Sequence, residues 1–273
     1  MPELPEVETI REGLEKKVKG KRIEKVLIEN EKSIKLPSPV EFVSRIEGKV
    51  ISEIKRRGKY LILSLDSKDN LAIHLKLTGR LIYSQKGDKP DYTRVIFVFQ
   101  DQTQLSFTDI RGFGGLWLVS DEEFWMVPSL QNLGPEPLEK DFTVSKFKDL
   151  LSGKRGKIKP LLMDQTFIAG IGNIYSQEAL FLAGIHPKRS PSSLIDREIE
   201  GLYNNLLNIL QEAISYRGSS VDVYVDLNGK KGDYESHLRV YGRAGKNCPR
   251  CGAVIERVKI AGRGTYLCPR CQK

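Results

Sequence analysis

Near the start of the chain, hydrophobic positions recur every three or four residues. Val7, Ile10, Leu14 and Val18 are apolar, and charged residues fill most of the positions between them. This period is typical of an amphipathic helix that buries one face. Gly20 follows the apolar stripe and indicates the end of the helix. We therefore expect a helix that holds the first residues of the chain against a core.

The next hundred residues change to a short, strand-like pattern. Eight segments are alternating or rich in β-branched residues and are separated by polar turns, which is typical of β-strands. These segments are 22–28, 50–54, 59–65, 71–77, 80–83, 95–99, 104–107 and 116–119. Many short strands at this spacing favour a sandwich or barrel over a parallel sheet. The pattern predicts an α+β chain that begins with a β-sandwich or barrel flanked by the N-terminal helix.

A helical period returns after a proline-rich interruption at 134–137, which we interpret as an interdomain hinge. Four helices are predicted beyond it, at 143–151, 157–163, 173–182 and 192–216. The polar loop at 219–236 is too long for a simple connection and is a candidate functional segment. We predict three domains, at 1–133, 134–236 and 237–273.

All four cysteines lie near the C-terminal end, in two matched pairs. Cys248 and Cys251 form one C-x₂-C pair, Cys268 and Cys271 form the other, and sixteen residues separate the pairs. Each such pair can present two thiolates to a tetrahedral ion, so the spacing predicts a Zn²⁺ site. A thiol-redox protein is the alternative, but it seldom needs two matched pairs. Four thiolates leave no open position for a substrate, so the metal is expected to be structural.

The charge of the chain indicates an anionic partner. The 273 residues include 44 Lys and Arg against 35 Asp and Glu, a formal net charge of +9. This excess favours nucleic acid or an anionic membrane surface. No apolar run approaches the roughly 18 residues of a membrane span, and the acidic start does not resemble a signal peptide. We expect a cytosolic protein without a membrane partner.

The first residues after Met1 carry candidate chemistry. Removal of the initiator methionine would leave Pro2 with a free secondary amine, whose ordinary pKa is about 7.7–8.0. Such an amine can form a Schiff base, and Glu3 and Glu6 place carboxylates close to it. The alternative is that Pro2 and the acidic residues only open a helix, where both types are favoured.

Several other residues allow both a functional and a structural reading. The basic run at 56–59 places Lys59 at the start of an apolar strand, and a second basic run begins at Lys154. His74 lies within the predicted strand 71–77 and is as readily a core histidine as a ligand. Arg111 and Phe113 share a glycine-flanked loop suited to filling a gap between stacked bases. The glycine-paired turn at 169–173 precedes a helix and could expose backbone amides to a phosphate.

Taken together, these motifs resemble those of one family. The opening run at 2–9, the basic turn at 57–61, Asp164-Gln165, the glycine turn at 170–175 and the run from Val240 to Cys271 are similar to the signatures of formamidopyrimidine-DNA glycosylases. The matches occur in order and span the whole chain. The resemblance implies a β-sandwich, a helix–two-turns–helix DNA-binding domain and a zinc finger that holds one Zn²⁺ ion.

The resemblance also implies a reaction. By similarity, Pro2 is the nucleophile that attacks the sugar carbon of a damaged nucleotide, and Glu3 assists the opening of the sugar ring. Lys59 corresponds to the proton donor of β-elimination and Arg263 to that of δ-elimination. The implied partner is double-stranded DNA containing oxidised purines, such as 8-oxoguanine and formamidopyrimidines, with the damaged base flipped out of the stack. The implied DNA-contacting residues are Glu6, His74, Leu77, Tyr92, Arg111, Phe113, Lys154 and Asn173.

Some positions depart from the family pattern. Leu77 stands where a methionine wedge is usual, Thr78 where some members carry a glutamate, and Tyr92 where a histidine is common. Asp222 and Asp226 add acidic groups to the loop that would cradle the lesion. These changes leave the expected roles intact but bear on lesion preference. The expected protein is a monomeric bacterial enzyme of the cytosol and nucleoid.

Two alternatives are consistent with the same motifs. An enzyme resembling endonuclease VIII would remove oxidised pyrimidines with the same Pro-Glu opening. A zinc-ribbon protein could bind DNA without catalysis.

Overall fold

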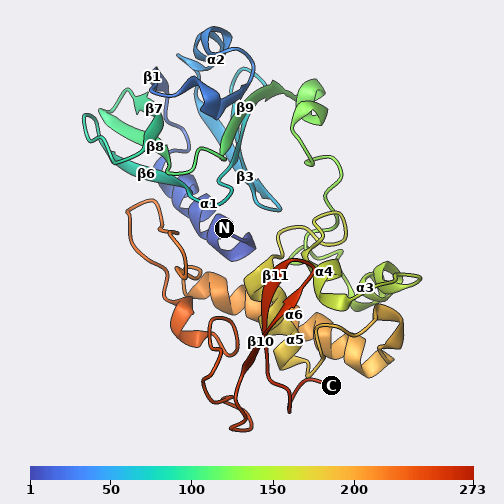
Figure 1. The fold of residues 1–273 in the computed structure, drawn as a ribbon. Coiled ribbons are helices and arrows are strands. Elements are labelled where there is room, and N and C mark those ends of the chain that lie inside the picture. The colour runs from blue at the N-terminus through green and yellow to red at the C-terminus, as the bar shows by residue number, and fades with distance from the viewer. The chain divides into compact units, whose positions relative to one another are not determined.

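The computed structural model describes every residue from 1 to 273. The chain forms two compact units, each built from two stretches of sequence (Figure 1). The first unit comprises Met1–Gln131 and Tyr216–Asp233, and the second comprises Asn132–Ser215 and Tyr234–Lys273. No helix is long and apolar enough to span a membrane.

The first unit contains two α-helices and nine strands. The helices are α1 (Leu4–Lys17) and α2 (Pro39–Ile46). The strands are β1 (Ile23–Ile28), β2 (Ile34–Leu36), β3 (Ile51–Arg57), β4 (Tyr60–Leu65), β5 (Asp69–His74), β6 (Gly79–Gln85), β7 (Thr93–Phe99), β8 (Thr103–Asp109) and β9 (Gly115–Ser120). The predicted N-terminal helix is confirmed, and each of the eight predicted strand segments overlaps an observed strand.

The nine strands form two sheets with a shared core. One sheet has the order β1-β7-β8-β6, and the other has the order β2-β9-β5-β4-β3. All pairings are antiparallel except that of β2 with β9. Phe97 of β7, Leu63 of β4 and Ile10 of α1 belong to one buried apolar cluster. The predicted β-sandwich flanked by a helix is therefore confirmed.

Strand β2 and helix α2 of the first unit were not predicted. Strand β2 is only three residues long, too short for an alternating pattern to be recognised. Helix α2 does carry a local signal, because Ser38 caps its start by accepting a hydrogen bond from the Glu41 amide and Pro39 occupies the first turn. Its Phe42 and Ile46 are buried in the core.

Two connections between the sheets lie beside each other. Residues 75–78 lead from β5 to β6, and residues 110–114 lead from β8 to β9. At the start of β6, Gly79 pairs with Asp109, and at the end of β5, His74 pairs with Gly115. Strand β5 ends at His74, so the predicted strand at 71–77 is too long, and Leu77 lies in the turn.

The segment Tyr216–Asp233 packs with the first unit, although we predicted it as part of a domain at 134–236. Leu227 is only 2% exposed and joins the sandwich core, and its carbonyl oxygen accepts a hydrogen bond of 2.8 Å from the Tyr83 amide. Gly13 of α1 allows this approach, because a Cβ atom there would lie 2.9 Å from Leu227 Cδ1. The apolar side chains of this loop thus determine where it packs.

The second unit combines the predicted helices with the cysteine-rich segment. Its elements are α3 (Val144–Leu151), α4 (Ile158–Met163), α5 (Asn173–Leu182), α6 (Asp196–Ser215), β10 (Glu256–Ile260) and β11 (Arg263–Leu267). Helix α6 begins later than the predicted residue 192, because Pro191–Ser193 forms a separate 3₁₀ turn. The residues of the predicted domains 134–236 and 237–273 that lie outside Tyr216–Asp233 form one compact unit, and their division into two domains stays a prediction.

Candidate functional site

The N-terminal residues are fixed at the start of α1. Pro2 and Glu3 are buried, and Glu3 caps the helix. The Glu3 amide donates a hydrogen bond of 2.8 Å to Glu6 Oε2, and these two residues form a capping box. The first turn therefore holds Pro2 and Glu3 in defined positions.

The loop at 216–233 is tied to this turn through Glu6. The Ser219 amide donates a hydrogen bond of 2.8 Å to Glu6 Oε1. Gly218 has a φ of +78° and lies so close that a Cβ atom there would be 2.9 Å from Glu6 Cγ. Tyr224 is buried nearby, and burial together with the Glu6 carboxylate raises the pKa of its phenol. Each Glu6 carboxylate oxygen thus accepts a hydrogen bond from a backbone amide, one at the start of α1 and one in the loop. Glu6 therefore joins the loop to α1.

The amino group of Met1 lies at the surface of the same region. It is 2.9 Å from Asp222 Oδ2, and both side chains are more than one-third exposed. While Met1 is present, the Pro2 nitrogen belongs to an amide and cannot act as a nucleophile. The structure thus places Asp222 beside the chain terminus from which the predicted nucleophile would be released.

Lys59 lies in the tight turn between β3 and β4. Gly58 has a φ of +56°, a conformation that glycine adopts readily. The Lys59 side chain is only 5% exposed, and its charge contributes to lowering the pKa of His74. Beside the turn, Arg56 Nε donates a hydrogen bond of 2.7 Å to Glu8 of α1. This ion pair fixes the turn to the N-terminal helix.

His74 is a buried neutral imidazole. Burial, with further effects of Lys76 and Lys59, lowers its pKa to about 3. Its Nδ1 atom accepts a hydrogen bond of 2.9 Å from the Lys76 amide, so the ring proton is on Nε2. The ring also packs edge-on against Tyr60, with the centroids 4.5 Å apart. Both the core role and the predicted DNA contact are compatible with this geometry.

The lowered pKa of His74 predicts acid sensitivity. The unfolded chain takes up this proton below about pH 6.5, whereas the folded chain resists it down to about pH 3. The free energy of unfolding should therefore fall as the pH drops through this interval, by about 1.4 kcal/mol per pH unit. Between pH 7 and pH 5, His74→Gln should lose about 2 kcal/mol less stability than the wild type. Urea titrations at the two pH values measure this difference, and equal losses would contradict it.

The two sheet-crossing loops carry the residues predicted to enter DNA. Leu77 lies in the 75–78 turn, and Arg111 and Phe113 lie in the 110–114 loop. The Arg111 guanidinium sits over the Phe113 ring, 4.8 Å from its centroid, and the ring is 52% exposed. Tyr92 is 57% exposed with a φ of +59°, and its carbonyl oxygen accepts the Asp109 amide. The structure therefore brings these predicted contacts to one end of the sandwich.

In the second unit, Asn173 begins α5 directly after the predicted glycine turn. Its Oδ1 atom accepts a hydrogen bond of 2.8 Å from Lys159 Nζ, which also donates to Thr265 Oγ1 at 2.8 Å. Arg263 is exposed and begins β11, two residues before Thr265. Lys154 is exposed in the loop between α3 and α4. Asn173 and the Arg263 strand are thus connected through one buried lysine.

Lys159 was predicted only as part of the basic run that begins at Lys154, and Glu178 was not predicted. Lys159 is 0% exposed, and its signal was a lysine flanked by apolar residues at 158–162. Glu178 lies on the buried helix α5, and its carboxylate accepts the amides of residues 239, 240 and 241 at 2.7–2.8 Å. Burial raises the pKa of Glu178, and these amides act in the opposite direction. Both residues stabilise the second unit internally.

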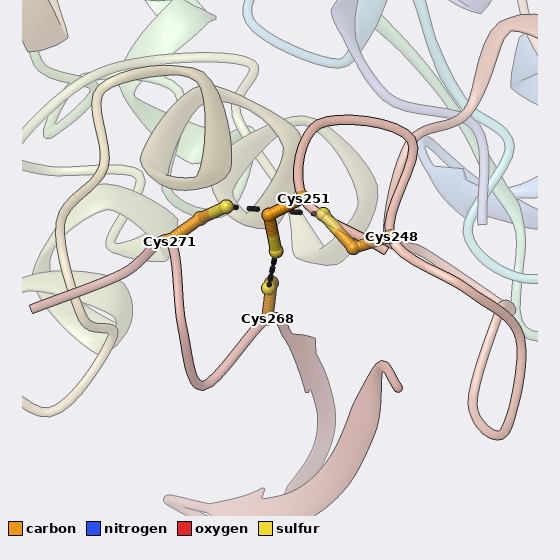
Figure 2. A group of neighbouring side chains, drawn as sticks. All are labelled: Cys248, Cys251, Cys268 and Cys271. Atoms are coloured by element: carbon orange, nitrogen blue, oxygen red, sulfur yellow. Dashed lines mark hydrogen bonds between the residues drawn. The ribbon is translucent and has the colours of Figure 1, made fainter. Parts of the chain in front are cut away.

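The four cysteine sulfurs converge on one point (Figure 2). All lie within 4.8 Å of one another, with 3.9 Å between the sulfurs of Cys248 and Cys271 and 3.5 Å between those of Cys251 and Cys268. A tetrahedral ion with Zn–S bonds of about 2.3 Å requires sulfur separations in this range. The residues therefore fit one structural Zn²⁺ ion, with no coordination position left for a substrate.

The predicted site residues fall into two groups. The first unit holds Pro2, Glu3, Glu6, Lys59, His74, Leu77, Tyr92, Arg111 and Phe113. The second unit holds Lys154, Asn173, Arg263 and the four cysteines.

Three family descriptions match the sequence in order. Residues 1–116 match the formamidopyrimidine-DNA glycosylase N-terminal domain, and residues 133–225 match its H2TH domain. Residues 245–273 match the zinc finger found in FPG and IleRS. The predicted zinc finger with one structural zinc is thereby confirmed.

Whole-length relatives carry the same description. The chain is 46% identical to a formamidopyrimidine-DNA glycosylase of Pelotomaculum thermopropionicum, covering 100% of this chain and 99% of the relative. It is also 46% identical to one of Heliobacterium modesticaldum, covering both chains fully.

Solved structures agree with the sequence comparison. A Lactococcus lactis FPG mutant in complex with Fapy-dG containing DNA has a TM-score of 0.92 and 38% identity, with both chains fully covered. The same organism's Fpg in complex with DNA containing an abasic site has a TM-score of 0.91 and 37% identity, covering 99% of each chain. These full-length matches, together with the buried Pro-Glu start and the four-cysteine cluster, establish that the chain belongs to the formamidopyrimidine-DNA glycosylase family.

Proposed function

We propose that this chain is a bifunctional DNA glycosylase and AP lyase of base excision repair. Its substrate is duplex DNA that contains oxidised purines, and it acts as a monomer in the bacterial cytosol. The observation that carries this proposal is the buried Pro2-Glu3 start of α1 in the same unit as the buried Lys59. Family membership and the DNA-bound relatives support the choice of substrate.

The glycosylase step uses the N-terminal amine. After Met1 is removed, the Pro2 nitrogen attacks C1′ of the damaged nucleotide, and the C1′–N bond to the base breaks. The base leaves with the bonding electrons and a proton. Glu3 supplies a proton to the ring oxygen, so the sugar opens and C1′ becomes an iminium carbon. The capping box fixes Glu3 next to Pro2 for this transfer.

The lyase step uses the iminium as an electron sink. Water takes a proton from C2′ as the C3′–O bond breaks, and a second elimination then transfers the C4′ proton to water as the C5′–O bond breaks. In this proposal, Lys59 and Arg263 donate protons to the departing phosphates. Water then releases the amine, so the step needs no redox cofactor. Lys59 is already desolvated in its turn, and Arg263 stands exposed at the start of β11.

The remaining predicted residues would bind DNA. Lys154, Asn173 and the finger strands would contact phosphates, and the net charge of +9 favours this polyanionic partner. Leu77, Arg111 and Phe113 would occupy the space left by the flipped nucleotide. The zinc ion supplies structure to the finger and takes no part in proton transfer.

Borohydride trapping tests this proposal. Wild-type protein incubated with an 8-oxoguanine duplex and borohydride should give a covalent protein–DNA adduct, because reduction captures only an iminium intermediate. A zinc-ribbon protein that binds without catalysis would give no adduct. A matched thymine glycol duplex separates the purine enzyme from one that prefers oxidised pyrimidines, and faster trapping on thymine glycol would overturn the proposed substrate.

A further inference from the structure

Asp109 links the two loops that the proposed function inserts into DNA. It ends β8 and is only 1% exposed. One carboxylate oxygen accepts the Thr78 hydroxyl, from the turn that carries Leu77. The other accepts the Gly114 amide at 2.7 Å, at the far end of the loop that carries Arg111 and Phe113. A single buried carboxylate therefore spans both loops.

Thr78 completes the link from the opposite side. Its hydroxyl donates to Asp109 and accepts a hydrogen bond of 3.0 Å from the Arg111 amide. The same amide lies 3.2 Å from Asp109 Oδ1, so Thr78, Asp109 and Arg111 form a closed ring of contacts. We call this group of three residues the Asp109 joint. It fixes the backbone at both Leu77 and Arg111.

The backbone of Asp109 extends the joint to a third segment. Its amide donates a hydrogen bond of 3.0 Å to the Tyr92 carbonyl oxygen. Its carbonyl oxygen accepts Arg94 Nε at 2.8 Å. The exposed Tyr92, another predicted DNA contact, is thus held to the same residue.

Close packing leaves the joint little freedom. A Cβ atom at Gly114 would lie 2.7 Å from Phe107 Cζ and 3.1 Å from Asp109 Oδ2. Gly112 has a φ of +69°, which lets the loop turn sharply between Arg111 and Phe113. The Arg111 guanidinium in turn covers the Phe113 ring. The exposed Arg111 and Phe113 side chains therefore project from a loop held by the buried Asp109, whose two carboxylate oxygens both accept hydrogen bonds.

We propose that Thr78 and Asp109 are positioning residues that make the 75–78 and 110–114 loops enter the DNA as one rigid piece. This inference rests on the proposed function and deepens it. Filling the gap left by a flipped nucleotide requires Leu77 and the Arg111–Phe113 pair to arrive together, since a gap filled from one side leaves bases unstacked. A rigid joint fixes their spacing before DNA binds. The two loops therefore lose little conformational entropy when they insert.

The decisive variant is Thr78→Val, which keeps the shape of the side chain but removes the hydroxyl. Thr78→Ser retains the hydroxyl and should behave like the wild type. A matched control is Thr103→Val at the other end of β8, which removes a similar hydrogen bond from Thr103 to Asp101, of 2.6 Å. Any general loss of stability that a Thr→Val change causes at the end of a strand should appear in that control.

The first measurement is base extrusion, followed by stopped-flow fluorescence of 2-aminopurine beside an 8-oxoguanine. Thr78→Val should slow extrusion about tenfold, the effect of losing one hydrogen bond to a charged group. Thr78→Ser and Thr103→Val should stay within about twofold of the wild type. Trapping on an abasic duplex should also change little in Thr78→Val, because no base has to be expelled. An equal loss on both substrates, or wild-type extrusion, would overturn the positioning role.

The second measurement needs no DNA and no activity. Hydrogen exchange at the Arg111 amide should be about tenfold faster in Thr78→Val, since that amide loses an acceptor, and unchanged in Thr103→Val. Unchanged exchange in Thr78→Val would show that the joint does not hold the loop. If the wild-type protein gives no adduct on any duplex, the proposed function fails, while the exchange result still decides on the joint.

Discussion

Protein that keeps Met1 should form at least about a thousandfold less borohydride-trapped adduct than processed protein, as expected when a covalent catalyst loses its nucleophile. The reason is the electronic state of the Pro2 nitrogen. In the unprocessed chain it is an amide nitrogen, whose lone pair is delocalised into the carbonyl group. Removal of Met1 converts it into a secondary amine with a pKa near neutrality. The Met1 amino group lies one residue further out, at the surface and 2.9 Å from Asp222.

The two forms can be prepared from one sequence by expression with and without active methionine aminopeptidase, and intact mass distinguishes them. Both should bind an abasic duplex with similar affinity, since Glu3, Glu6 and the loop at 216–233 keep their contacts. Lys59→Ala in processed protein is the matched control for catalysis. It should still be trapped but should cleave the strand more slowly, because the amine is intact and only a proton donor is lost. Equal trapping of the two forms would remove Pro2 from the mechanism.

The fold could be predicted where the sequence carried a local period. The β-branched and aromatic run at 95–99 and the three- to four-residue period in α1 identified elements that the structure confirms. The four cysteines identified the zinc site because their spacing alone determines the ligand geometry. These signals are local, so no knowledge of the tertiary fold was needed.

Other features depend on contacts between distant segments, and their local signals in the sequence were weak or absent. The loop at 216–233 appears polar, yet Leu227 and Tyr224 place it in the core of the first unit. In the sequence, Asp109 is an aspartate at the end of a strand. Its contacts arise only because the β5–β6 and β8–β9 connections cross between the sheets at the same end. Lys159 was part of a basic run. The charge of this run did not indicate that Lys159 would be buried and would donate hydrogen bonds to Asn173 and Thr265. In each case, the fold brings together residues that are far apart in the sequence.

Besides retention of Met1, removal of the zinc ion is the change for which we expect the largest effect. Structural zinc contributes about 10–16 kcal/mol to the folding of small zinc fingers, more than the stability of most domains. Without the ion, four thiols would face one another within 4.8 Å, and the bonds that join the two cysteine turns through the metal would be lost. The β10–β11 hairpin should therefore lose its order. Arg263 would then no longer be fixed at the start of β11, and affinity for an abasic duplex should fall at least about tenfold, as for other losses of several phosphate contacts.

Loss of zinc should loosen other parts of the second unit but should leave the first unit unchanged. Gln177 of α5 accepts the Tyr266 amide, and Gln272 donates a hydrogen bond of 3.0 Å to the Ile185 carbonyl oxygen, so hydrogen exchange should rise in both the finger and the end of α5. Both tryptophans, Trp117 and Trp125, belong to the first unit, and their fluorescence should report an unchanged melting transition after chelation. Cys271→Ser should reproduce the loss of affinity, and added Zn²⁺ should restore the chelated wild type but not this variant. Full affinity after verified removal of the metal would show that the finger does not contribute to DNA binding, and proton donation by Arg263 would then lose its structural basis.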